Sequence, residues 1–191
     1  MVKLTKIYTR TGDGGETGLV DGSRLSKSAL RMEAIGDVDE ANSAIGVALT
    51  RIEDETARAM LGRIQNELFD LGADIATPGE DFAPSEMVLR IVAAQIARLE
   101  AEIDTMNASL APLSSFILPG GDPGAAHLHL ARAIVRRAER ALVGASREAS
   151  INPLALAYIN RLSDHLFVLC RLLNGAGARD ILWKPGATRD A

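Results

Sequence analysis

Apolar residues recur every three or four positions in five stretches of the chain, which is the spacing of one face of an α-helix. The stretches cover about residues 31–52, 55–76, 85–107, 123–147 and 153–173. Short runs of Gly, Pro, Asp and Ser separate them. The pattern predicts an all-α protein, a five-helix bundle around one hydrophobic core.

Residues 122–123 and 152–153 mark two helix starts, because each pair is an N-cap acceptor followed by proline at the first helical position. Ser85 is expected to cap the third helix, and the Asn-Gly pair at 174–175 is expected to end the fifth. The fifth helix contains the run LFVLC at residues 166–170, which is apolar nearly all round. We therefore expect it to be the buried central helix.

The chain has 191 residues, a length that suits one domain with a core of its own. It divides into an N-terminal loop (1–30), the helical bundle (31–175) and a C-terminal tail (176–191), with irregular structure expected in the loop and the tail. Aromatic residues make up only 4% of the chain, so the core must be built from aliphatic side chains and alanine.

The formal net charge of −4 gives no general attraction for nucleic acid, so an anion site requires a local cluster of basic residues. Cys170 is the single cysteine and lies in an apolar run, which indicates a packed thiol and a reducing compartment. No run approaches the ~18 apolar residues that a membrane-spanning helix needs. These features predict a cytoplasmic protein that binds neither nucleic acid nor membrane.

The stretch TRTGDGGETGL, residues 9–19, is unusually rich in glycine and threonine. It lacks the residue order of a P-loop and of a dinucleotide-binding turn. Its glycines nevertheless allow successive N–H groups to turn toward one anion, the threonines add hydroxyl donors, and Arg10 and Lys27 add charge. The composition alone fits both a flexible connector and a phosphate-binding loop.

Three arginines form a stripe on the fourth helix, since Arg132, Arg136 and Arg140 follow one another at intervals of four in the run ARAIVRRAER. Like charges at this spacing repel by a few tenths of a kcal/mol per pair. The apolar residues of the helix lie on the opposite side. The stripe could therefore face water, another subunit or an anion.

A group of polar residues interrupts the fifth helix at Asn160, Arg161 and Asp164. A polar group on a buried helix must be hydrogen-bonded, or it costs ~1–3 kcal/mol. These side chains therefore either pair with the fourth helix or belong to a ligand site. His127 and His129 diverge by about 200° on a helix and cannot share a metal ion without help.

Five motifs occur in order from about Lys6 to Arg171: KIYTRTGDGGETGL, GDVDEANSAIG, FILPGG, ARAIVRRAER and NRLSDHLF. Together they resemble the PduO-type ATP:cob(I)alamin adenosyltransferases. The resemblance implies a homotrimer of five-helix bundles that binds ATP, Mg²⁺ and a corrinoid at the subunit interface. The reaction it implies moves the 5′-deoxyadenosyl group of ATP to the cobalt of cob(I)alamin, giving adenosylcobalamin and triphosphate. It also implies a flavin-type reductase and an adenosylcobalamin-dependent acceptor enzyme as partners.

The resemblance assigns roles to single residues. Phe116 matches the aromatic residue that displaces the lower axial ligand of cobalt, and it is an expected catalytic residue together with Arg136 and Asn160. Asp39 and Arg132 match an acid and a base that pair across the subunit interface. The expected nucleotide contacts are Thr9, Arg10, Thr11, Gly12, Thr17, Gly18, Lys27, Arg136, Arg137, Ala138, Glu139, Arg140 and Asn160.

One position departs from the family pattern. Gly14 stands where the family often has lysine, so one cationic phosphate contact is either absent or supplied by Arg10 and Lys27. The resemblance identifies no side-chain ligands of Mg²⁺.

The residues present suit this reaction, because cob(I)alamin is itself a strong nucleophile and needs no base from the protein. The protein must align the reactants, neutralise a triphosphate of about four negative charges, and supply an apolar environment for cobalt. Two rival interpretations remain open at this point. One is a non-catalytic module that stores or delivers corrinoid under the control of a nucleotide, and the other is a purely structural bundle.

Overall fold

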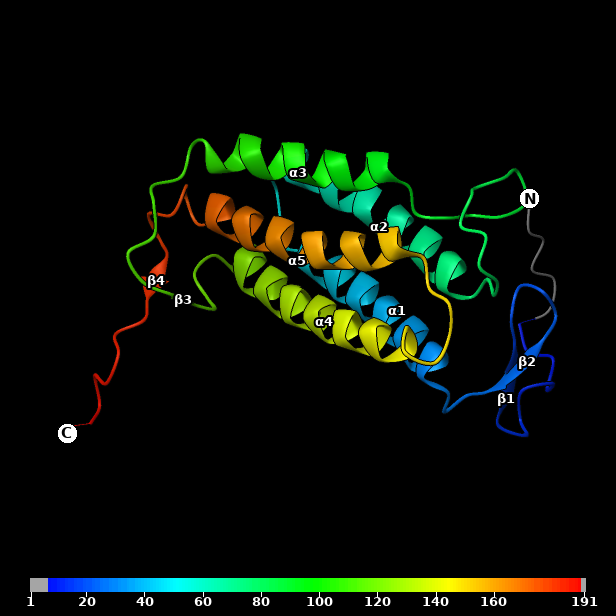
Figure 1. Ribbon diagram of the computed structural model, residues 1–191. Coiled ribbons are helices and arrows are strands. Elements are labelled where there is room, and N and C mark those ends of the chain that lie inside the picture. The colour runs from blue at the N-terminus through cyan, green and yellow to red at the C-terminus, as the bar shows by residue number, and fades with distance from the viewer. Residues whose placement is uncertain (1–6, 190–191) are drawn as a thin grey trace.

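The computed structural model describes residues 7–189, so positions 1–6 of the predicted N-terminal loop and positions 190–191 of the tail lie outside the described part. It confirms an all-α bundle of five helices (Figure 1). The sequence did not predict the four short strands that accompany them. The helices are α1 (Leu30–Leu49), α2 (Glu55–Ile75), α3 (Ala93–Asn107), α4 (Pro123–Ala145) and α5 (Pro153–Leu173).

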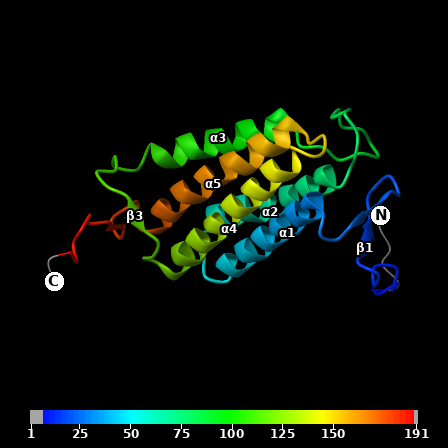
Figure 2. The same ribbon diagram turned by 60° about the horizontal axis from the view of Figure 1, so that its bottom comes forward.

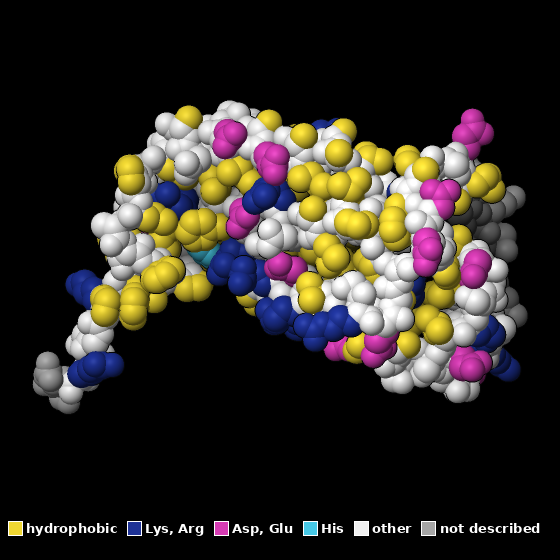
Figure 3. Space-filling model, in the orientation of Figure 1, with side chains coloured by type: hydrophobic (Ala, Val, Ile, Leu, Met, Phe, Trp, Pro, Cys, Tyr) yellow, Lys and Arg dark blue, Asp and Glu magenta, His cyan; other side chains and the backbone are white. Residues whose placement is uncertain are grey.

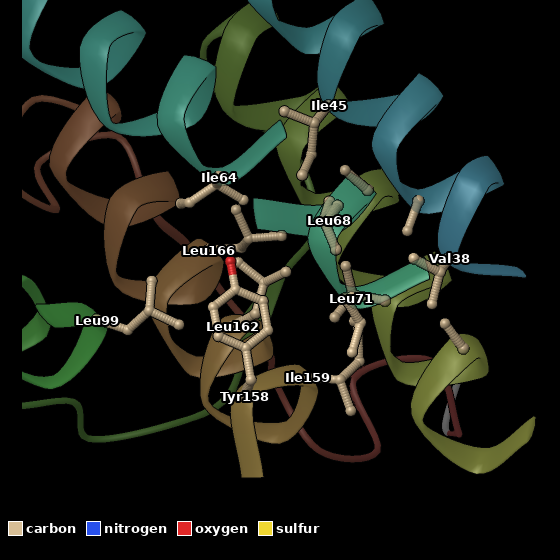
Figure 4. Close-up of a cluster of buried hydrophobic side chains, with 14 of the residues drawn as sticks. Val38, Ile45, Ile64, Leu68, Leu71, Leu99, Tyr158, Ile159, Leu162 and Leu166 are labelled. Atoms are coloured by element: carbon tan, nitrogen blue, oxygen red, sulfur yellow. The ribbon is translucent and has the colours of Figure 1, made fainter. Parts of the chain in front are cut away.

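Helix α5 is the central element of the bundle, as its apolar sequence predicts. It packs against α4, α3 and α2, while α1 packs against α2 and α4. Figure 4 shows side chains of α1, α2, α3 and α5 meeting in one aliphatic cluster, with Tyr158 as its largest member. Each fully buried leucine or isoleucine in such a core stabilises the fold by about 1.5–3 kcal/mol. The core therefore depends on aliphatic packing, with few aromatic rings.

The helix ends that carry a local signal are confirmed. The Asp122 carboxylate accepts the N–H of Gly124 at 2.9 Å, and the Asn152 side chain accepts the N–H of Leu154 at 3.0 Å, each before a proline at the helix start. Helix α5 ends at Leu173, as predicted, and Gly175 follows with a φ of 67°, a left-handed conformation that favours glycine.

The predicted start of the third helix at Ser85 is wrong, since α3 begins at Ala93. The buried carboxylate of Asp74 on α2 causes the difference. It accepts the backbone N–H of Ile91 at 2.8 Å and pairs with Arg90 at 2.8 Å, which holds this segment outside the helix. Ser85 caps a turn instead, because its hydroxyl accepts backbone N–H groups of the next residues.

The four strands form two small antiparallel sheets. Strands β1 (Glu16–Gly18) and β2 (Arg24–Ser26) pair as a hairpin beside the start of α1, and the N–H of Val20 anchors the hairpin on the Ala76 carbonyl at 3.1 Å. Strand β3 (Ile117–Leu118) pairs with β4 (Ile181–Leu182). Figures 1 and 2 show the two sheets at opposite ends of the bundle. Within residues 7–189, no helix is long and apolar enough to cross a membrane.

Candidate functional site

The glycine- and threonine-rich stretch is a folded turn held by its own hydrogen bonds. The hydroxyls of Thr9 and Thr11 lie 2.8 Å apart, and the Arg24 guanidinium donates to the Thr11 carbonyl at 2.8 Å. Arg10 has a φ of 62°, which is unusual for a residue with a side chain. The N–H of Lys27 donates to the Gly15 carbonyl at 2.8 Å and closes the loop on β2. This geometry favours a shaped loop over a loose connector.

The surroundings of Gly12 and Gly14 show which cation lies near the loop in place of the lysine that the family often has at position 14. A Cβ built at Gly12 would lie 3.1 Å from the Lys27 ammonium nitrogen, so this cation lies directly over the turn. A Cβ built at Gly14 would have no neighbour within 4 Å. Lys27, the residue after β2, therefore brings a positive charge to the loop at Gly12. The loop at Gly14 has open space beside it.

The arginine stripe lies on the outside of α4. Arg136 and Arg140 are exposed, and neither forms an ion pair with any described residue. They line an indentation of about 360 Å³ together with Glu139 and Arg147. Figure 3 shows Lys and Arg side chains gathered in a band on this face of the molecule. Unpaired positive charges so close together repel each other, and they make a site suited to a polyanion.

Arg137 and Ala138 differ from the rest of the motif. Arg137 pairs with Asp37 at 3.2 Å and also with Glu40, so two acids of α1 already hold its charge. Ala138 is completely buried in the core. Its side chain lies on the inward face of α4, so a contact of Ala138 with the nucleotide would have to come from its backbone.

Asn160 donates a hydrogen bond to the Glu139 carboxylate at 2.8 Å and so links α5 to the nucleotide motif on α4. The expectation that Asn160 is buried is wrong, since its side chain is exposed, as is that of Asp164. Both lie on the one narrow side of α5 that α3 and α4 leave uncovered. Pairing with the fourth helix is thus observed, and an exposed pair can also receive a ligand.

An apolar pocket of about 520 Å³ lies at the opposite end of α4 from the hairpin. It is lined by Leu113, Ser114, Ser115, Phe116, Ile117, Arg132 and Phe167. The Phe116 side chain is 78% exposed, so a large ring faces the opening. Arg132 lies over the face of the Phe167 ring, with its guanidinium carbon 5.9 Å from the ring centroid.

The C-terminal tail lies against Phe116. The N–H of Trp183 donates to the Phe116 carbonyl at 2.8 Å, and the two ring centroids are 6.1 Å apart. The Ser115 hydroxyl donates to the Trp183 carbonyl at 2.8 Å. This contact could not be predicted from sequence patterns, because Ser115 and Phe116 are far from Trp183 in the chain.

His129 lies buried behind this pocket, edge-on to the Phe167 ring with centroids 6.4 Å apart. Neither ring nitrogen has a hydrogen-bond partner in the described part of the chain. Burial, and after it the charge of Arg132, hold the pKa of His129 below its ordinary value. The ring is therefore neutral near pH 7.

We expect stability to fall on mild acidification because of His129. Its lowered pKa means that the unfolded chain binds the proton first, so the stabilising effect is complete above about pH 6.5 and is lost as the pH falls toward the folded-state pKa. Urea unfolding at about pH 7 and pH 5 measures the loss. His129→Leu should shrink the difference between the two values. His127→Leu, on the same helix, is the control, and an equal effect of both variants would contradict the assignment.

Asp39 and Arg132 form no ion pair with each other within the described chain. Asp39 instead lines a pocket of about 500 Å³ between α1 and α2. The hairpin and the apolar pocket lie at opposite ends of the bundle (Figure 1), and Arg132 is the residue of the stripe that reaches the pocket. One chain thus leaves the glycine- and threonine-rich loop apart from Phe116.

Sequence reasoning missed the acids that hold Arg137 and the guanidinium of Arg24 that ties the loop. A signal existed for the former, since Asp37 and Glu40 lie three apart on the first helix and so share a face. Arg24 carried no signal, because its partner is a backbone carbonyl.

The fold and the site define a class of protein, an all-α bundle with an exposed polycationic stripe for an anion and an apolar pocket. The chain matches the family model for cobalamin adenosyltransferase over residues 7–173. It belongs to the cobalamin adenosyltransferase family.

Similar proteins are spread across bacteria. A corrinoid adenosyltransferase of Mycobacterium tuberculosis is 49% identical over 100% of this chain and 98% of its own length. A cobalamin adenosyltransferase of Cupriavidus metallidurans is 49% identical over 95% and 96% of the two chains. A solved PduO-type ATP:corrinoid adenosyltransferase of Lactobacillus reuteri, a phenylalanine-to-alanine variant complexed with cobalamin and ATP, has a TM-score of 0.85, with 38% identity over 94% of this chain and 99% of its own.

Proposed function

We propose that this chain is an ATP:corrinoid adenosyltransferase, which moves the 5′-deoxyadenosyl group of ATP to the cobalt of cob(I)alamin and releases triphosphate. The observation that carries the proposal is the exposed pair of unpaired arginines, Arg136 and Arg140, on a member of the cobalamin adenosyltransferase family. The cobalt–carbon bond forms as the bond from C5′ to the phosphate oxygen breaks. Cobalt supplies the electron pair, and the triphosphate leaves with the pair of the broken bond.

The protein's part is to hold ATP and to stabilise the charge of the leaving group. Arg136 and Arg140 contact the phosphates from α4, while the Thr9–Gly18 loop and Lys27 contribute hydroxyl, N–H and ammonium donors. Fixed donors of this kind stabilise developing charge without reorganisation during the reaction. Asn160 keeps a free amide oxygen while it donates to Glu139, so the pair can orient the nucleoside. Arg137 supports the motif through its α1 acids.

The apolar pocket receives the corrinoid, and Phe116 displaces the lower axial ligand of cobalt. Loss of that ligand makes cob(II)alamin easier to reduce to the nucleophilic cob(I) state. The exposed ring and the apolar lining beneath it support this role.

The active unit is a homotrimer with its sites between subunits. The loop at the hairpin and the apolar pocket lie at opposite ends of the bundle in one chain, so a second copy is needed to bring a loop to the pocket. The pocket between α1 and α2 supports an interface there, because it is largely apolar and Phe69 beside it is 71% exposed. Asp39 in this pocket pairs with Arg132 of the partner, which compensates the stripe.

Mg²⁺ enters with ATP. Within residues 7–189, no group of three or more His, Cys, Asp or Glu side chains could hold a metal ion alone. Mg²⁺ commonly binds substrate phosphates, several waters and one or two carboxylates, and Glu139 offers one carboxylate in the basic indentation. The site therefore fits a metal that arrives on the nucleotide, and bound Mg²⁺ lowers the charge of the triphosphate.

The protein works in the cytoplasm with a flavin-type reductase and an adenosylcobalamin-dependent acceptor enzyme. Its one thiol fits a reducing compartment without taking part in the reaction. Burial raises the pKa of Cys170 to about 12, so the thiolate that would react is not formed near neutral pH.

Turnover with cob(I)alamin and MgATP tests the proposal. We expect adenosylcobalamin and triphosphate in equal amounts, and a stabilisation by MgATP of about 2.7 kcal/mol at a concentration 100 times Kd. Product formation is followed by the cobalamin absorption spectrum, and stabilisation by thermal unfolding. Stabilisation by MgATP without product would favour a nucleotide-gated storage module, and no stabilisation would favour a structural bundle.

A further inference from the structure

Asn174 uses all of its polar groups at the end of the bundle that carries Phe116. Its side chain is completely buried. The amide oxygen accepts the N–H of Asp122 at 2.9 Å, and the amide nitrogen donates to the Gly120 carbonyl at 3.2 Å and to the Asp180 carboxylate at 3.1 Å. Its backbone carbonyl also accepts the N–H of Arg179 at 2.9 Å. One side chain at the end of α5 thus joins the turn before α4 to the C-terminal tail.

The Gly-Gly turn after β3 is shaped around this side chain. Gly121 has a φ of 97°, and a Cβ added there would collide with the Asn174 carboxamide. Both the left-handed backbone and the collision exclude any other residue at position 121 unless the turn shifts. Asn174 therefore fixes the chain only a few residues after Phe116.

The tail is tied to the same point. Asp180 accepts from Asn174 with one carboxylate oxygen and from the Arg171 guanidinium with the other, at 3.0 Å, and both of the charged side chains are buried. Arg171 also donates to the Ala111 carbonyl at 2.8 Å, on the segment that leads to the pocket. Two residues after Asp180, β4 ends, and Trp183 donates to the Phe116 carbonyl.

Phe116 needs such support because its other contacts, to Trp183 at the end of β4, depend on the position of the tail. Its side chain is 78% exposed, so its own burial contributes little, and β3 and β4 have only two residues each. Strands this short are not stable by themselves. The buried hydrogen bonds of Asn174 hold both strands at one end of the β3–β4 pair, after Leu118 and before Ile181, and Phe116 lies at the other end of the pair.

We propose that Asn174 is a positioning residue for Phe116: with Asp180 it locks the Gly-Gly turn and β4, and so holds the Phe116 ring at the mouth of the apolar pocket. The inference rests on the proposed role of Phe116 in displacing the lower axial ligand. It assigns to the end of α5 a part in activating cob(II)alamin that is separate from nucleotide binding.

Asn174→Ala tests the proposal in two assays on the full-length protein with MgATP. One assay starts from chemically reduced cob(I)alamin, and the other from cob(II)alamin with a reductant. Because small displacements of a positioned group cost about 10- to 100-fold in rate, we expect a loss of that size in the cob(II) assay and little loss in the cob(I) assay. The EPR spectrum of bound cob(II)alamin should also keep the splitting from the lower nitrogen ligand.

Asn152→Ala is a matched control at the other end of α5. Asn152 is equally buried and makes the same pattern of bonds, accepting the N–H of Leu154 and donating to the Asp74 carboxylate and the Ile91 carbonyl. We expect both variants to lose stability, and only Asn174→Ala to change the ratio of the two rates. A merely structural role would lower both rates equally in both variants.

Two changes at the partners of Asn174 provide independent tests of the proposal if Asn174→Ala does not fold. Asp180→Asn removes the carboxylate charge to which Arg171 and Asn174 both donate. Gly121→Ala pushes the turn away from Asn174. Both should lower the cob(II) rate selectively, and an unchanged ratio in both would overturn the inference. If Phe116→Ala shifts the ratio while the Asn174 variants do not, the proposed function survives and the positioning role fails. Absence of product with the unmodified protein would instead reject the proposed function.

Discussion

Arg136→Ala should lose at least about 100-fold in kcat/KM for adenosyl transfer, the loss seen when a single donor to developing negative charge is removed. Arg136 lies exposed in the basic indentation and has no described ion-pair partner, so its charge is free for a phosphate. The same exposure predicts an almost unchanged stability, within about 0.5 kcal/mol. Steady-state kinetics and urea unfolding of the same preparation measure the two effects.

Two further variants separate charge from geometry. Arg136→Lys keeps the charge but loses the planar fork that can bind a phosphate through two hydrogen bonds, so we expect intermediate activity. Arg98→Ala is the control, because Arg98 is an exposed arginine far from the stripe. Helix α3 lies on the other side of α5 from α4, and Arg98 forms a salt bridge to Glu67 at 2.7 Å. This variant should keep nearly full activity. Normal turnover by Arg136→Ala would mean that the stripe does not bind the phosphates.

Much of the fold could be predicted because its signals are local. An acceptor before proline at 122–123 and 152–153 acts on N–H groups within three residues, so sequence alone places the starts of α4 and α5. The start of α3 depended instead on Asp74, a buried carboxylate on another helix. Periodicity cannot reveal such a partner, and the segment before Ala93 therefore looked helical.

In the candidate site, too, local spacing could be predicted, whereas contacts made by the folded chain could not. The spacing of Arg136 and Arg140 correctly indicated two exposed arginines on one helix face, whereas Arg132, the third arginine of the stripe, is half-buried. Motif membership, by contrast, says nothing about the direction of each side chain. Ala138 belongs to the motif and lies in the core, and Asn160 belongs to a buried helix and lies at its surface. The contacts of Trp183 with Phe116 needed the folded chain, since the pairing of β3 with β4 creates them.

Gly14 is easier to interpret once the loop is seen folded. The Lys27 ammonium lies over the turn at Gly12, and Arg10 is held in a left-handed conformation beside it. The Arg10 guanidinium lies over the Tyr8 ring, 5.7 Å from its centroid, so Lys27 is the cation placed at the turn even without lysine at position 14. The hydrogen bond from the Lys27 N–H to the Gly15 carbonyl fixes the backbone of this residue, which supports phosphate binding by the loop as proposed.

Phe116→Ala should separate the two halves of the reaction. Starting from cob(II)alamin with a reductant, we expect the rate to fall by about tenfold or more, because without the ring the lower ligand stays on cobalt and reduction is harder; a tenfold change corresponds to about 1.4 kcal/mol in the barrier. Starting from cob(I)alamin, which needs no further reduction, the rate should fall much less. The two assays use the same product spectrum.

The control for ring loss is Phe82→Ala, which removes a phenylalanine that packs on Arg90 in the loop before α3. It should leave the ratio of the two rates unchanged. Equal losses in both assays for Phe116→Ala would mean that the ring only packs against the corrinoid or Trp183. A selective loss would instead show that the ring acts on cobalt coordination. Because Phe116 is 78% exposed, that effect cannot be attributed to a collapsed core.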